Sequence, residues 1–158
     1  MTPRLIVMRH ATAGQTESGQ SDHQRKLTDY GEKETILISE ELSKICWIPD
    51  IALVSSSTRT RETHSFLMPI PIEVREEIYQ ASLEILLSIV ENLHAEKTTL
   101  LLGHNPGCEL LTATLSGNFH SMPPASCALF RKEGEDWILE KMLKVPFLHP
   151  SIQRGPFE

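Results

Sequence analysis

Two histidines of the chain, His10 and His104, each follow a short apolar run. His10 comes directly after Arg9 and the apolar residues 5–8, and His104 comes after residues 98–102 and a glycine. A neutral imidazole can attack phosphorus, and a guanidinium can neutralise the oxygens of a phosphoryl group. These residue types therefore predict phosphoryl chemistry, provided that the fold brings the two histidines together.

Both apolar runs are typical of central strands in a sheet that is covered on both faces. In open α/β sheets, ligands bind at the carboxyl ends of such strands, so we expect both histidines at one edge of the sheet. The rest of the pattern predicts alternating strands and helices. The expected strands are 5–8, 50–54, 72–75, 98–102, 126–131 and 137–142, and the expected helices are about 28–45, 58–66, 82–93 and 106–115.

Thr28 and Ser82 are the predicted N-caps of the first and third helices. Residues 11–28 between the first strand and the first helix are rich in Thr, Gly, Ser and Gln, which predicts a long loop over the site. The predicted apolar stripe of the first helix consists of Ile36, Leu37, Leu42 and Ile45.

Length and composition favour one domain. The chain has 158 residues, of which 40% are hydrophobic, so we expect a single domain over 1–158 with an extended tail over 145–158.

A net charge of -6 without runs of like charge argues against nucleic-acid binding. The first apolar run is too short for a signal peptide or a membrane span, so we expect a cytoplasmic protein. Cys46, Cys108 and Cys127 lack C-x-x-C spacing, which predicts reduced thiols.

Other phosphatase and metal chemistries lack their residues. None of the three cysteines is followed by an arginine at the C-x5-R spacing of cysteine phosphatases. The chain contains neither a G-x-x-x-x-G-K-[ST] phosphate loop nor an H-E-x-x-H zinc spacing. We therefore expect a site that works with no metal and no cofactor.

Four motifs occur in order: Arg9-His10, Arg25-Lys26-Leu27-Thr28-x-x-Gly31, Val54-Ser55-x-x-x-Arg59-x-x-x-Thr63 and Gly103-His104-Asn105-Pro106. With them, most of the chain resembles the histidine phosphatase superfamily, and within it the short phosphohistidine phosphatases of the SixA type. The resemblance implies a three-layer α/β/α fold with a mostly parallel central sheet, as in phosphoglycerate mutase. Ala11, Lys26 and Ser56 differ from residues common in that superfamily, but none of these changes removes a charged or nucleophilic group.

The resemblance also implies a phosphate pocket, with His10 as the nucleophile and Arg9 and Arg59 as forks that bind the phosphoryl oxygens. His104 completes the pocket as a donor to a phosphoryl oxygen. Taken alone, Arg59 would be an exposed helix arginine paired with Glu62 or Glu34. Arg25 is either a third substrate-binding cation or solvated. Arg61 is expected at the surface. The remaining histidines are expected at the surface or at the edge of the core, and they are His23, His64, His94, His120 and His149.

The general acid is left open: Glu76, Glu77 or no residue. Members of the superfamily that cleave phosphate esters commonly use a carboxylic acid to protonate the leaving oxygen. A phosphohistidine substrate needs an acid less, because the imidazole can leave as a neutral group.

The favoured function is hydrolysis of phosphohistidine on a protein through phospho-His10, because the chain has no long insertion with which to enclose a metabolite. The alternative is a phosphatase of a small phosphate ester with the same core. A non-catalytic module that binds phosphate or phosphopeptides is less favoured, because the nucleophile is intact. The expected partner is accordingly a phosphorylated protein histidine, as in a phosphotransfer domain, or a small phosphorylated substrate.

Overall fold

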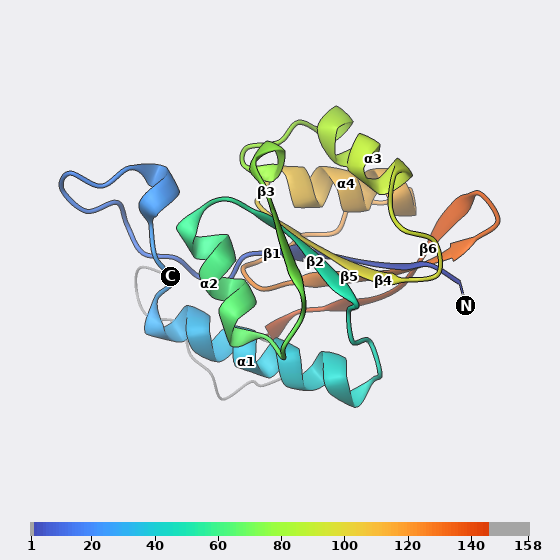
Figure 1. Cartoon of the computed structure of the whole chain (residues 1–158), viewed down its shortest axis with the longest axis horizontal. Helices are drawn as coiled ribbons and strands as arrows, with labels where there is room; N and C mark the ends of the chain where they lie inside the picture. The colour runs from blue at the N-terminus through green and yellow to red at the C-terminus, as the bar shows by residue number, and fades with distance from the viewer. Residues whose placement is uncertain (1, 146–158) are drawn as a thin grey trace.

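A six-stranded sheet with the strand order β3-β2-β4-β1-β5-β6 forms the centre of the molecule (Figure 1). The computed structural model describes residues 2–145. Strands β1 to β4 are parallel, whereas β5 is antiparallel to β1 and β6 is antiparallel to β5. The mostly parallel sheet is therefore confirmed. The strands are β1 (Arg4–Arg9), β2 (Ile51–Ser55), β3 (Ile72–Arg75), β4 (Thr98–Gly103), β5 (Cys127–Glu133) and β6 (Asp136–Leu143).

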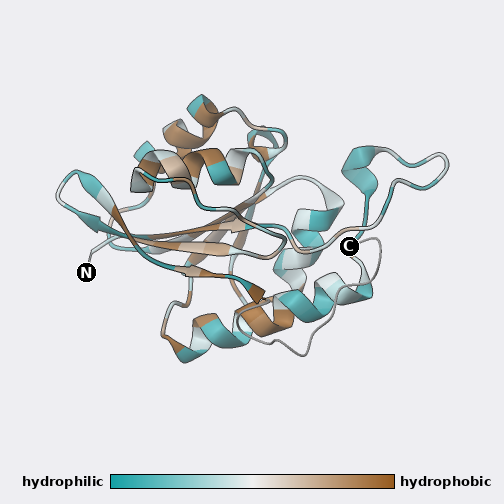
Figure 2. Ribbon diagram, turned by 180° about the vertical axis from the view of Figure 1, so that it is seen from behind, coloured by the Kyte–Doolittle hydropathy of each residue, from teal (hydrophilic) through white to brown (hydrophobic). Residues whose placement is uncertain are grey.

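Helices cover both faces of the sheet (Figure 1). Helices α1 (Asp29–Lys44) and α2 (Thr58–Phe66) lie on one face, and α3 (Leu83–Glu91) and α4 (Gly107–Ser116) lie on the other. Figure 2 shows that the strands between them are mainly hydrophobic. Two hydrophobic cores result, one that includes Leu42 of α1 and one that includes Leu86 of α3 and Leu111 of α4. The expected three-layer α/β/α arrangement is thus confirmed.

Hydroxyl side chains cap three of these helices. Thr28 Oγ1 accepts a hydrogen bond from Gly31 N at the start of α1, and Ser57 and Ser82 accept the equivalent bonds at α2 and α3. Such caps satisfy backbone N–H groups that have no partner inside the helix. The predicted starts at Thr28 and Ser82 are confirmed, and α2 has its predicted bounds.

The buried face of α1 differs from the predicted apolar stripe. Ile36 is 43% exposed, and Leu37 and Ile45 are only partly buried. Polar residues take part in the buried face because α1 packs against α2 and against the loop after β1 as well as on the sheet. A prediction based on the apolar residues alone therefore does not give the buried face of α1. The buried residues of α1 are Gly31, Glu34, Thr35, Ile38, Ser39 and Leu42.

The carboxyl ends of β1, β2 and β4 meet at one edge of the sheet, because the three strands are parallel neighbours. Arg9 lies opposite Gly103 in the register of β1 and β4, and His10 N donates to Gly103 O at 3.0 Å. Ser55 ends β2 beside them. The sheet therefore brings His10 and His104 to the same edge, as the sequence predicts.

The predicted loop over 11–28 is present and carries the short 3-10 helix η1 (Asp22–Gln24). A single bridge between Ala13 and Leu27 closes its base, and Figure 1 shows the loop projecting from the body of the molecule. The predicted tail from residue 146 onward lies outside the described residues. No helix within residues 2–145 has the length and apolar character needed to cross a membrane.

Candidate active site

His10 is buried at the end of β1 with one ring nitrogen engaged. Its Nδ1 lies 2.7 Å from the carbonyl oxygen of Ala11, and because a carbonyl only accepts, Nδ1 must carry the proton. Burial above all, and then the neighbouring His104, Arg59 and Arg9, lower the pKa of His10 to about 3. The ring is therefore neutral near pH 7 with its lone pair on Nε2, which is the form that can act as a nucleophile.

Buried hydrogen bonds fix the turn that holds His10. Ala11 N donates to Thr63 Oγ1 of α2 at 3.1 Å. Thr12 donates from both its N and its Oγ1 to Glu34 Oε1 of α1, at 2.8 and 2.6 Å. Because Ala11 supplies the carbonyl that holds His10 Nδ1, these contacts fix both the orientation of the ring and its tautomer.

His104 lies beside His10, with 5.3 Å between the ring centroids. Its Nε2 is 2.7 Å from Ser55 Oγ, and its Nδ1 is buried without a hydrogen-bond partner among the described residues. Burial, and then the charge of Arg59, lower the pKa of His104 to about 4. His104 therefore adds a second neutral ring next to the first.

A hollow of about 410 Å³ opens beside His104 and is lined by Arg59, Asp22 and the start of α4. The side chain of Arg59 is only 7% exposed, and its Nε is buried without a partner in the described part of the chain. Buried polar groups normally have partners, so the unpaired Arg59 Nε and His104 Nδ1 indicate a site built for a polar ligand. Because the guanidinium of Arg59 is a cation, the ligand that fits this site is an anion.

Arg9 approaches the same edge from β1. Its Nη1 donates to Met122 O at 3.1 Å, and its charge lowers the pKa of both histidines. The fold thus gathers His10, His104, Arg9 and Arg59, so that two cations lie near two neutral imidazole rings. This arrangement is suited to phosphoryl transfer.

Among solved structures, the chain superimposes on a protein of Agrobacterium tumefaciens provisionally named phosphohistidine phosphatase SixA. The TM-score is 0.82 at 26% sequence identity, over 91% of this chain and 99% of that one. It also superimposes on the protein histidine phosphatase SixA complexed with tungstate, with a TM-score of 0.80 at 20% identity, over 92% and 99% of the two chains. The resemblance to the histidine phosphatase superfamily is confirmed. Both of these solved structures are SixA proteins by name.

Sequence comparison also finds a relative of the chain. An uncharacterized chloroplastic protein of Arabidopsis thaliana is 28% identical over 149 residues, which cover 85% of this chain and 68% of that protein. No family model matches the chain. The structural match to SixA supports a phosphatase of the histidine phosphatase type.

The candidate site also contains Asp22 and Tyr79, which sequence reasoning missed. Asp22 Oδ2 accepts from Arg59 Nη2 at 3.1 Å and from Tyr79 OH at 2.6 Å. The Tyr79 ring stands edge-on to His104, with the centroids 5.5 Å apart. The hydrogen bond from Tyr79, followed by those from the arginines, holds the pKa of Asp22 well below its usual range. Asp22 is therefore an ionised carboxylate at the hollow beside His104.

Arg25 and Arg61 occupy different places. Arg25 donates from Nε to Gly14 O at 2.7 Å and from Nη1 to Asp22 Oδ1 at 3.0 Å, so its charge is engaged by the loop that carries it. Arg61 is exposed as predicted, and its Nε donates to Ser56 O at 3.1 Å. Arg59 pairs with Asp22 and with neither Glu62 nor Glu34 in the contacts that we observe.

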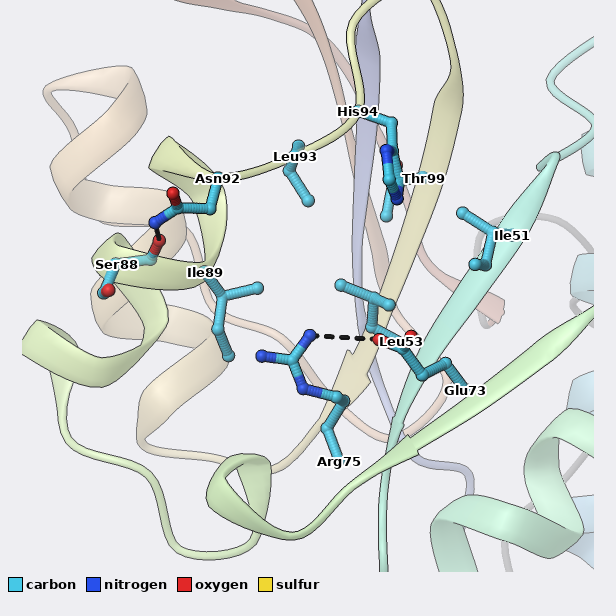
Figure 3. A pocket seen from close by; sticks show the side chains of 10 residues that line it. All are labelled: Ile51, Leu53, Glu73, Arg75, Ser88, Ile89, Asn92, Leu93, His94 and Thr99. Atoms are coloured by element: carbon cyan, nitrogen blue, oxygen red, sulfur yellow. Dashed lines mark hydrogen bonds and ion pairs between the residues drawn. The ribbon is translucent and has the colours of Figure 1, made fainter.

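The two acid candidates Glu76 and Glu77 lie on the surface, and Glu77 pairs with Arg75. Figure 3 shows Arg75 in a second hollow, of about 220 Å³, between α3 and strands β2 and β3. There Arg75 also bonds Glu73 at 3.0 Å. Among the described residues, the carboxylate that lines the hollow beside His104 is Asp22 and neither of the two glutamates.

One of the remaining histidines is at the site, contrary to prediction. His23 Nε2 lies 2.9 Å from Ser56 Oγ, and its ring packs edge-on against Tyr79. His64 bonds the carbonyl of Ile70, and His94 is exposed, as expected for residues outside the site. His149 lies outside the described residues. Within residues 2–145, no group of three His, Cys, Asp or Glu is arranged to hold a metal ion.

The lowered pKa values of His10 and His104 give a testable pH dependence. Both rings stay neutral well below the ordinary histidine pKa of 6.5. After correction for ionisation of the substrate, we therefore expect kcat/KM to stay level from pH 7 to about pH 5. At pH values between the pKa of these histidines in the unfolded chain and their lower pKa in the folded protein, the unfolded chain binds more protons than the folded protein. The free energy of unfolding should therefore fall as the pH falls from about 6.5 towards 3. A pH–rate profile with an acid limb centred at 6.5 would contradict the buried, neutral histidines.

Proposed function

We propose that the chain hydrolyses phosphohistidine on a protein through a covalent intermediate on His10. The observation that carries the proposal is the buried, neutral His10, whose Nδ1–H is fixed on Ala11 O next to two arginines. The structural likeness to SixA proteins supports the same reaction class.

In the proposed reaction, His10 Nε2 forms a bond to phosphorus while the phosphorus–nitrogen bond of the substrate breaks. The electron pair of that bond goes to the substrate imidazole, which leaves as a neutral ring when its other nitrogen carries the proton. Arg9 and Arg59 balance the charge on the phosphoryl oxygens during the transfer. Water then attacks the phosphorus of phospho-His10, which releases inorganic phosphate and restores the imidazole.

The preference for a P–N bond rests on the carboxylates near the site. An alkoxide leaving group needs a proton in the transition state, whereas an imidazole does not. Asp22 is ionised and hydrogen-bonded to three donors, and Glu77 is paired with Arg75. Neither carboxylate is therefore placed to protonate a leaving oxygen.

A substrate panel tests the proposal. We expect kcat/KM to be highest for a phosphohistidine protein or another phosphoramidate, intermediate for an aryl phosphate, and lowest for sugar or glycerate phosphates. The panel is run in EDTA, because two arginines supply the charge that a metal would otherwise supply. A preference for an alkyl ester would favour the small-molecule phosphatase instead, and a strict need for a divalent ion would contradict the two-arginine pocket.

A further inference from the structure

Asp22 occupies the part of Arg59 that a phosphate would use. Arg59 donates from Nη1 to the backbone oxygen of Asp22 at 2.7 Å and from Nη2 to its carboxylate at 3.1 Å. Two parallel donors on two oxygens is the geometry in which a guanidinium binds a phosphoryl group. The loop between β1 and α1 therefore places an internal anion on the cation that the proposed reaction needs.

The carboxylate of Asp22 accepts several charge-assisted hydrogen bonds, but it is also exposed to solvent. Tyr79 OH and Arg25 Nη1 also donate to its carboxylate. The Asp22 side chain is nevertheless 45% exposed, whereas that of Arg59 is 7% exposed. Moving Asp22 away thus uncovers little apolar surface, while Arg59 stays fixed in the wall of the pocket.

Two anions cannot share one side of a guanidinium without repulsion at such distances. We propose that Asp22 is an internal competitor for the phosphate site: its carboxylate covers Arg59 in the free protein and gives way when a phosphoryl group binds. This inference rests on the proposed function, because it assigns Asp22 a role at the same phosphate pocket. The exchange lowers the affinity for phosphate and so favours release of the product.

Removal of the charge on Asp22 should therefore strengthen oxyanion binding. Apparent affinity is reduced by the fraction of protein in which the site is covered. If Asp22 covers Arg59 in most molecules, Asp22→Asn should bind an oxyanion about 5- to 10-fold more tightly. A residue that merely supports the structure would change affinity in the opposite direction when it is removed.

The test is isothermal titration calorimetry of the full chain with tungstate. Asp22→Asn keeps the size of the side chain, and Asp22→Ala removes the acceptor as well. Glu17→Gln is the matched control, because it removes one exposed carboxylate from the same loop, in which only the backbone of Glu17 forms hydrogen bonds that we observe. Thermal unfolding of each variant verifies that the fold is kept.

We expect a lower Kd for tungstate in both Asp22 variants and an unchanged Kd in Glu17→Gln. An unchanged or higher Kd in Asp22→Asn overturns the inference, and so does an equal gain in the control, which would reveal a general effect of charge. If the inference is overturned in one of these ways while the wild-type protein turns over a phosphoramidate normally, the proposed function stands and only the role of Asp22 as a competitor is rejected. If the wild-type protein binds no tungstate and turns over no phosphoramidate, the proposed function and the inference both fail.

Discussion

His10→Ala is expected to abolish turnover, with kcat lowered by about 10⁵-fold or more, as for the loss of a covalent nucleophile in other enzymes. His104 cannot replace His10, because its Nε2 is engaged by Ser55 and its Nδ1 is buried. The fold should persist, since the His10 ring lies at the edge of the sheet and its one observed hydrogen bond is to the adjacent Ala11. Phosphoramidate hydrolysis, measured together with thermal unfolding, checks both statements.

A nucleophilic His10 also determines the chemical stability that we expect of the covalent intermediate. Attack by an imidazole leaves a phosphorus–nitrogen bond on the enzyme, which acid cleaves and alkali spares. Rapid quenching with labelled substrate, followed by peptide mapping, should place the label on His10. The hydroxyl group of Ser55 lies 2.7 Å from His104 Nε2, in a run with Ser56 and Ser57. A label that survives acid or maps to one of these serines would overturn the histidine mechanism even if His10→Ala were inactive.

The sequence predicts those parts of the site that depend on the sheet. Short apolar runs before His10 and His104 predict buried parallel strands, and parallel neighbours end at the same edge. The bounds of α2 follow from local signals as well, because Ser57 is a cap and the helix ends before Pro69. Position at a strand end and a local cap are properties of nearby residues, and therefore they are visible in one sequence.

The missed residues depend on contacts between distant segments. Asp22 meets Arg59 from 37 positions away and Tyr79 from 57 positions away. Its loop has no hydrophobic period that could fix its path. The sequence suggests that this loop covers the site, but it does not reveal which side chain points inward. The glutamates after β3 are candidates for the acid by their position in the sequence, which does not reveal that Glu77 pairs with Arg75.

Arg59→Ala is expected to lower kcat by about 10³-fold or more, because an arginine that balances charge on a transferring phosphoryl group contributes 10³ to 10⁵ in related chemistry. Arg61→Ala is the matched control. It removes the same group two positions further along α2, where the side chain is exposed and bonds only Ser56 O in the contacts that we observe. Its kcat should remain within about twofold of wild type, since exposed charges contribute little.

Arg59→Lys separates charge from geometry. A lysine keeps the positive charge but cannot donate two parallel hydrogen bonds from one plane. We therefore expect Arg59→Lys to recover only part of the kcat lost in Arg59→Ala. Because the buried Arg59 pairs with Asp22 when substrate is absent, thermal unfolding must accompany the kinetics of each variant. A folded Arg59→Ala protein with near-normal kcat, or an equal loss in Arg61→Ala, would mean that α2 supplies a different cation to the phosphoryl group.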